Sequence, residues 1–200
     1  MTNNREAYLD EMWAHDLEWS RKALIDKGEV VQMIVVHTRT NNSAIVVSIR
    51  PGVTKDEACR FARHVCVAYN ADAVTVMGEA WMLRGKDGKP ADTTAPPSES
   101  PDRIEVLAVS MSSRDDTGVI SHRASYRPIE RGADNKPTGV GAEVTWKGVE
   151  YVGRFAEILP ERKPTFTEQR IARKQLDAAR DAARDAMRFA THYQPSSTVH

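Results

Sequence analysis

Cysteine, net charge and long apolar runs are what this sequence has least of. Its 28 Lys and Arg residues equal its 28 Asp and Glu residues, so the formal charge is zero and binding of a polyanion over the whole surface is disfavoured. Only Cys59 and Cys66 carry thiols. They fall in one predicted helix with Cα atoms about 10 Å apart, beyond the ~7 Å limit for a disulfide. Free helical cysteines favour a reducing, cytoplasmic location.

Segments that would cross or be exported through a membrane are also missing from the pattern. The longest apolar stretch, residues 30–36, is interrupted by Gln32 and is far shorter than the ~20 residues that cross a bilayer. Residues 1–6 have no apolar run behind their charge, so no secretory signal is predicted. We therefore expect a cytoplasmic protein with no membrane partner.

Several motifs of catalysis and binding are absent. No histidine pair has the i, i+4 spacing of a zinc site, no G-x-S-x-G marks a serine nucleophile, and no G-x-x-x-x-G-K marks a phosphate loop. Bases alternate with acids after residue 168, which is typical of ion pairs along a solvated helix rather than of a helix that follows phosphates. Nucleic acid is therefore not an expected partner.

Two hundred residues suit a single domain, here residues 1–193, followed by a flexible tail over 194–200. The pattern divides the domain into an N-terminal helix over 4–27, a sheet-rich core over 30–158 and a C-terminal helix over 165–193. The apolar stripe of the N-terminal helix consists of Leu9, Trp13, Leu17 and Leu24. Gly28 stands at the position of a C-cap and is expected to end the helix.

The core region alternates strands with turn signals and one helix. Strands are predicted over 30–38, 44–50, 72–84, 104–111, 119–128, 143–146 and 149–155, with a polar loop over 131–139. The helix begins at a capping box of Thr54 and Glu57 and ends near Tyr69. This order, two strands, a helix and five strands, predicts an α+β fold with a mostly antiparallel sheet flanked by N- and C-terminal helices.

The C-terminal helix begins at a second capping box, Thr165 and Glu168, and has a stripe of small residues. The stripe consists of Ala172, Leu176, Ala179, Ala183, Ala186 and Ala190. Small side chains let another element approach closely, so the stripe indicates packing on the sheet of the same chain or on a second copy. Packing on its own sheet is the favoured interpretation, and self-association through 165–193 is the alternative.

Acidic residues gather around a long polar loop over 85–103. If the strands on either side of this loop pair, their carboxylates would meet at one end of the sheet: Glu79, Glu99, Asp102 and Glu105. Such a cluster could bind Mg²⁺ or Mn²⁺ or act as an acid and base pair, with His122 as a further base. The favoured alternative places Glu79 and Glu105 on a solvated face and residues 98–103 in a turn, because no established metal spacing occurs.

The same region resembles a group of small bacterial and phage proteins that have no assigned activity. The matching strings are Glu79-Ala80-Trp81-Met82, Pro97-Ser98-Glu99, Pro101-Asp102-Arg103 and Glu105-Val106-Leu107. The resemblance covers about residues 70–110 and implies a phage or mobile-element origin, but no catalytic role for any residue.

Two functions therefore remain open. The favoured one is a small cytoplasmic, non-enzymatic interaction or regulatory protein that needs no cofactor and binds a protein partner through Trp81, Ser98, Glu99, Asp102 and Arg103. The alternative is a metal-dependent hydrolase acting on phosphodiesters, as a nuclease does, with a site built from Glu79, Glu99, Asp102, Glu105 and His122. A ligand pocket beside Trp81 is a third interpretation, although a core position is favoured for this side chain.

Overall fold

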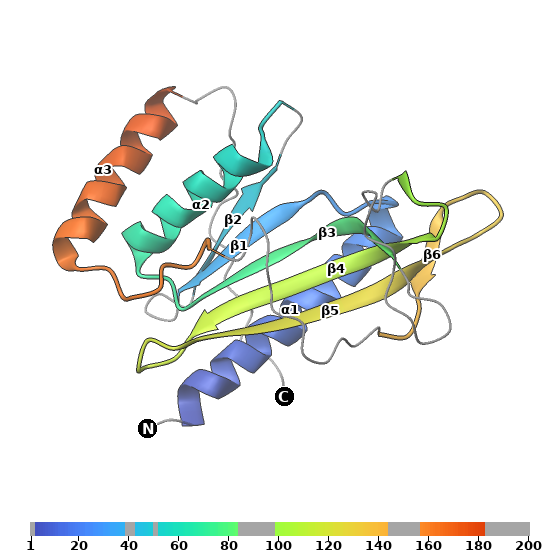
Figure 1. Ribbon diagram of the computed structural model, residues 1–200, viewed down its shortest axis with the longest axis horizontal. Coiled ribbons are helices and arrows are strands. Elements are labelled where there is room, and N and C mark those ends of the chain that lie inside the picture. Colours follow the sequence, from blue (N-terminus) through green and yellow to red (C-terminus); the bar gives the residue numbers. More distant parts are fainter. Residues whose placement is uncertain (1–2, 39–42, 50–51, 84–98, 144–156, 183–200) are drawn as a thin grey trace.

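A six-stranded antiparallel sheet with helices on both faces forms the centre of the molecule, which confirms the α+β class (Figure 1). The computed structural model describes residues 3–38, 43–49, 52–83, 99–143 and 157–182. Their elements are α1 (Asn3–Lys27), β1 (Met33–Thr38), β2 (Ser43–Ser48), α2 (Lys55–Tyr69), β3 (Ala73–Leu83), β4 (Arg103–Arg114), β5 (Ile120–Arg131), β6 (Pro137–Val140) and α3 (Phe166–Ala182). The strand order is β2-β1-β3-β4-β5-β6.

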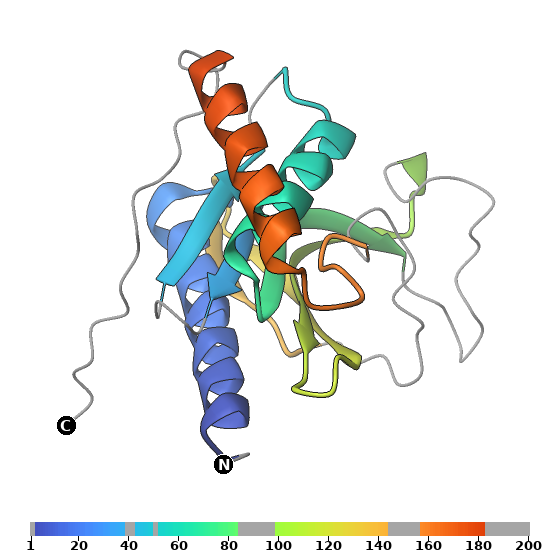
Figure 2. The same ribbon diagram turned by 90° about the vertical axis from the view of Figure 1, so that its left-hand side faces the viewer.

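The two faces of the sheet are covered by different helices. All six residues of β1 are buried, because α1 lies on one face and α2 on the other. Alternate residues of β3 divide between these faces: Val74 and Val76 pack with α2, whereas Ala73 and Met77 pack with α1. Figure 2 shows α1 and the α2–α3 pair on opposite sides of the sheet.

Helix α1 buries a different stripe from the predicted one. Leu9 and Leu24 are buried as expected, but Trp13 and Leu17 are only half-buried. The most buried side also includes Arg5, Met12, Asp16, Ser20 and Ala23. These positions recur at helical spacing, so the stripe is regular, but three of its members are polar. Arg5 and Asp16 have partners outside the helix, Asp72, Asp116 and His37, whereas Ser20 donates to the carbonyl of Leu17 in α1 itself. Local hydrophobicity does not report such partners.

Arg5 anchors the first turn of α1. Its side chain is 6% exposed and contacts two carboxylates, Asp116 Oδ1 at 2.6 Å and Asp72 Oδ1 at 3.2 Å. Arg114 is also buried and donates a hydrogen bond to the carbonyl of Pro160. These contacts join the start of α1, the β4–β5 turn and the segment that leads into α3.

The capping boxes predicted at Thr54 and at Thr165 are present. The Thr54 hydroxyl accepts from the amide of Glu57, and the Glu57 carboxylate accepts from the amide of Thr54, so α2 begins as the sequence indicates. Thr165 and Glu168 make the same reciprocal pair at the start of α3. Gly28 ends α1 with φ of +80°, a conformation that glycine adopts without strain.

Helix α3 packs on α2, and its predicted packing on the sheet is corrected. Ala172 and Leu176 are buried in the same cluster as Phe61 and Val65 of α2. Because α2 already lies on β1 and β2, its outer side is the apolar surface that remains for α3. Three members of the small-residue stripe, Ala183, Ala186 and Ala190, lie outside the described residues, as does the tail over 194–200.

The loop predicted over 131–139 is also corrected. Strand β5 continues to Arg131, and residues 137–140 form β6 after a turn in which Asn135 has φ of +62°. Pro137 suits an edge strand, because a proline at the first position of such a strand need not donate to a neighbour. The predicted strands over 143–146 and 149–155 fall almost entirely outside the described residues, as do residues 85–98.

Candidate functional site

Glu79 and Glu105 lie close together, as the pairing of their strands predicts, but an arginine from β5 contacts both of them. Arg131 Nε and Nη2 contact the two oxygens of Glu105, each at 2.7 Å, and Arg131 Nη2 lies 3.4 Å from Glu79 Oε2. The amide of Val30 donates to Glu79 Oε1 at 2.7 Å. We call Glu79, Glu105 and Arg131 the carboxylate cluster.

The pKa values of the two carboxyls in this cluster are shifted in opposite directions. Burial raises the pKa of Glu79, and the nearby charge of Glu105 adds to that effect. Hydrogen bonds from Arg131 lower the pKa of Glu105 against the effect of its burial. Opposite directions are typical of an acid and base pair, but a structural ion pair produces them too. Here the guanidinium occupies both oxygens of Glu105.

Asp102 and Glu99 do not join the carboxylate cluster. Both are exposed, and Asp102 lies in a turn in which the amide of Arg103 donates to the carbonyl of Ser100 at 3.4 Å. The Asp102 amide donates to the Ser100 hydroxyl at 3.2 Å, so a side-chain hydrogen bond also stabilises the turn. This is the turn predicted over 98–103, although Ser98 itself lies outside the described residues.

His122 lies far from the carboxylate cluster and on the other face of the sheet. His122 lies on β5 opposite Ser112 of β4, and the Ser112 hydroxyl is 2.8 Å from His122 Nδ1. Ser112 is seven residues from Glu105 along β4, which corresponds to about 23 Å, and an odd separation places the two side chains on opposite faces. His122 therefore does not act with Glu79 in this structure.

Trp81 is exposed, which corrects the expectation that it is a core residue. Its side chain is 43% exposed, and the guanidinium of Arg103 lies 4.5 Å from the centre of its ring. Trp81 pairs with Glu105 and lies on the α1 face, two pairs beyond Glu79 and Leu107. The C-terminal end of α1 packs against Leu107, so no described helix extends over Trp81. We call Trp81 and Arg103 the Trp–Arg patch.

A buried polar group was not predicted from the sequence. His37 Nε2 donates to Asp16 Oδ2 at 2.8 Å and lies 3.0 Å from Thr75 Oγ1. Asp, His and Thr are the residue types of a nucleophilic triad, but a triad needs the acid and the nucleophile on different nitrogens of the imidazole. Here both contact Nε2, and none of the three residues is more than 3% exposed. The group joins α1 to β1 and β3.

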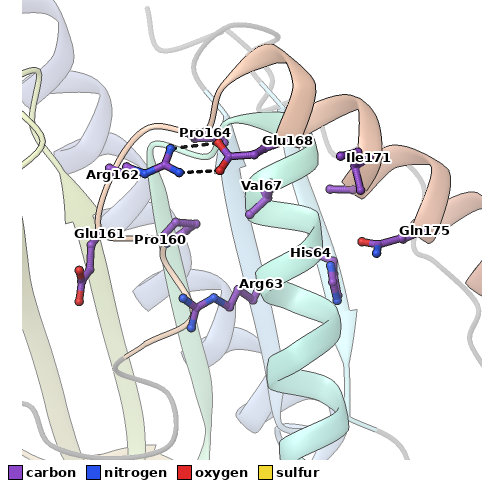
Figure 3. Close-up of a pocket in the computed structure, with 11 residues that line it drawn as sticks. Arg63, His64, Val67, Pro160, Glu161, Arg162, Pro164, Glu168, Ile171 and Gln175 are labelled. Atoms are coloured by element: carbon purple, nitrogen blue, oxygen red, sulfur yellow. Dashed lines mark hydrogen bonds and ion pairs between the residues drawn. The ribbon is translucent and has the colours of Figure 1, made fainter.

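A surface cavity of about 510 Å³ lies between α2 and α3 (Figure 3). Its basic residues already have partners: Arg162 contacts both oxygens of Glu168, and Arg63 donates to the carbonyl of Glu157 at 3.2 Å. Hydrogen bonds from Arg162 and from Thr165 lower the pKa of Glu168 to about 2. The charges around this cavity therefore hold the start of α3 in place.

Two broader searches of the described residues bear on function. Within those residues, no three His, Cys, Asp or Glu side chains are grouped so that they could hold one metal ion. No helix in the described ranges is long and apolar enough to cross a membrane.

The fold and the contacts define an α+β protein with helices on both faces of an antiparallel sheet and an exposed Trp–Arg patch at one end of β3 and β4. Comparison of the chain with protein-family models, curated proteins and solved structures found no match.

Proposed function

We propose that the protein is a non-enzymatic interaction or regulatory protein of the cytoplasm, of phage or mobile-element origin, and that it binds a protein partner through the Trp–Arg patch. The observation that carries this proposal is the exposure of Trp81, 43%, beneath the guanidinium of Arg103. Tryptophan and arginine are the residue types most enriched among the residues that dominate binding energy at protein interfaces. The resemblance of residues 70–110 to bacterial and phage proteins supports the origin.

The surroundings of the Trp–Arg patch favour binding because they hold it in place before a partner arrives. Trp81 lies inside β3 and is paired with β4, and its stacking on Arg103 restricts the rotamers of both side chains. A side chain that is already ordered loses less entropy when a partner covers it. Glu105, the cross-strand partner of Trp81, is fixed by Arg131, which stiffens the same end of the sheet.

The experiment introduces a photo-crosslinking amino acid at Trp81 and, as a control, at Val119. Val119 is 63% exposed but lies in the β4–β5 turn, at the far end of the sheet. We expect one protein of the native host to crosslink at position 81 and not at 119. The purified protein should then bind the wild-type chain, with a dissociation constant raised by about tenfold or more in Trp81→Ala and unchanged in Val119→Ala. Equal crosslinking at both positions, or equal affinity of both variants, would refute the proposal.

The metal-dependent hydrolase is the competing function, and the opposite pKa directions of Glu79 and Glu105 are the observation in its favour. The contacts of Arg131 count against it, because metal ions and general bases need the carboxylate oxygens that this guanidinium occupies. Under our proposal, the protein with Mg²⁺ or Mn²⁺ hydrolyses a phosphodiester substrate no faster than buffer with the same metal ion does. Turnover that is lost in Glu105→Gln and kept in Glu130→Gln, an exposed control on β5, would support the hydrolase instead.

A further inference from the structure

The two edges of the sheet differ in how well they are protected against pairing with another strand. Strand β6 is four residues long, begins with Pro137, and follows an irregularity in register at Glu130 and Arg131. Short length, proline and irregular register are the devices that stop an edge strand from pairing with another chain. Strand β2, at the other end of the sheet, has none of them (Figure 1). Its sequence is Ser-Ala-Ile-Val-Val-Ser, without charge, proline or glycine, and its register with β1 is regular.

The open groups on β2 belong to the backbone. Ile49 donates to the carbonyl of the residue opposite, Gln32, at 2.9 Å, which identifies the hydrogen-bonded pairs of the β1–β2 ladder. Because such pairs alternate along an antiparallel ladder, Ile45 and Val47 bond to β1, whereas Ala44, Val46 and Ser48 direct their amides and carbonyls outward. No hydrogen bond from a described residue reaches these outward groups.

The side chains of β2 already pack within the chain. Ala44 and Val46 pack with the α1 face, and Ile45 and Val47 pack with the α2 face. Ala44 is 7% exposed and Val47 is 6% exposed. What β2 offers to a partner is therefore a row of amides and carbonyls with apolar flanks, and the group that satisfies such a row is another extended backbone.

We propose that β2 pairs with β2 of a second copy of this chain, antiparallel about a two-fold axis at Val46. The outward-facing residues are centred on Val46, so the axis places Val46 opposite its counterpart and Ala44 opposite Ser48. Each of these pairs exchanges two hydrogen bonds, and every outward group of β2 is satisfied. No charged residue lies between positions 43 and 49, so no like charges meet at the axis. A two-fold contact of one patch with itself is the commonest form of homodimer.

The partner strand must be uncharged and rich in β-branched residues to match the flanks of β2, and a second β2 has this composition. The pairing would join the two sheets into one, with both α1 helices on one face and both α2 helices on the other. This interface lies at the opposite edge of the sheet from β6 and does not involve Trp81. The dimer proposal is therefore tested independently of the proposed function.

The test combines molecular mass with amide hydrogen exchange of the full chain. We expect light scattering to give a monomer at about 10 µM and an increasing share of dimer towards about 500 µM, because dimerisation follows mass action. The amides of Ala44, Val46 and Ser48 should exchange freely at the low concentration and become protected at the high one. Those of Ile45 and Val47 should be protected at both, since they bond to β1.

Three variants make the test specific to the axis. Val46→Lys and Val46→Glu each place like charges opposite one another, so neither should dimerise alone, and an equimolar mixture should regain a heterodimer. Regain in the mixture also shows that both variants fold. Val46→Pro removes an outward amide without removing a bond to β1, so it should abolish the dimer while circular dichroism stays that of the wild type. A monomer at all concentrations, a dimer that leaves the three outward amides unprotected, or a mixture that stays monomeric would overturn the proposal.

Discussion

Asp16→Asn is the substitution that tests the buried polar group most directly. The side chain of Asp16 is 4% exposed and accepts a hydrogen bond from His37 Nε2 at 2.8 Å. Burial by itself raises the pKa of this carboxyl, but hydrogen bonds with His15, His37 and Thr75 outweigh burial and lower the pKa to about 2. Asparagine keeps the shape of the protonated carboxyl and cannot ionise, so the variant removes only what the charge contributes.

The magnitude follows from the two pKa values. A carboxyl of ordinary pKa 3.8 in the unfolded chain and about 2 in the folded chain stabilises the fold by about 2 kcal/mol when it is ionised. Because the folded value is the lower one, this contribution is fully present above about pH 4 and is lost as the pH falls towards about 2. We therefore expect Asp16→Asn to reduce the free energy of unfolding by about 2 kcal/mol near pH 7.

Urea denaturation followed by circular dichroism measures this free energy at a series of pH values. The difference between wild type and Asp16→Asn should be constant at neutral pH and shrink between about pH 4 and about pH 2. Asp26→Asn is the matched control, since Asp26 is exposed near the end of the same helix, and it should change stability by less than about 0.5 kcal/mol. An Asp16→Asn variant as stable as the control at neutral pH, or a difference that does not depend on pH, would refute the reasoning.

Three further outcomes are expected. In Gly78→Ala the new Cβ would lie 3.1 Å from the Cα of Gln32, so a thermal melt should show a loss of about 1–3 kcal/mol, and an unchanged midpoint would contradict the close approach. Complete burial of Cys66 raises the pKa of its thiol, so in Cys59→Ser an aromatic disulfide reagent should label the protein only after unfolding; rapid native labelling would argue against that burial. Thr165→Ala removes the cap of α3 and should cost about 1 kcal/mol, seen as faster exchange of the α3 amides, and unaltered exchange would argue against the cap.

Local chemistry explains what the sequence predicts well. Two capping boxes and one C-terminal glycine mark helix boundaries through contacts between residues three or four apart, and the structure has all of them. Alternating hydrophobicity likewise identifies β3 as a central strand and places β4 and β5 in a hairpin. These signals are complete within a few residues, so they can be interpreted without knowledge of the tertiary structure.

The errors arise where a partner is distant in the sequence. Asp16 looks like a solvent-facing residue of α1 until His37 and Thr75 are placed beneath it. The same holds for β6, which exists because β5 offers it an edge and because Pro137 is tolerated there.

The candidate site follows this division as well. The proximity of Glu79 and Glu105 follows from the pairing of two neighbouring strands. Arg131 was missed because it closes the end of β5, in a stretch that looked like loop, and no local signal assigns it to the carboxylates. The exposure of Trp81 depends on where α1 ends above the sheet, which strand composition does not determine.

The position of α1 has a consequence for the order in which the chain folds. This helix is synthesised before the sheet, and several of its contacts are with residues made much later: Arg5 with Asp116, Asp10 with Arg123, and Leu24 with Leu107. Closing loops of this length is slow, and the sheet face that α1 covers is complete only once β3 has paired with β1 and with β4. On the ribosome, part of its apolar side therefore stays exposed until β4 has been made, and a chaperone that binds apolar helices would meet this protein through α1 before the sheet is complete.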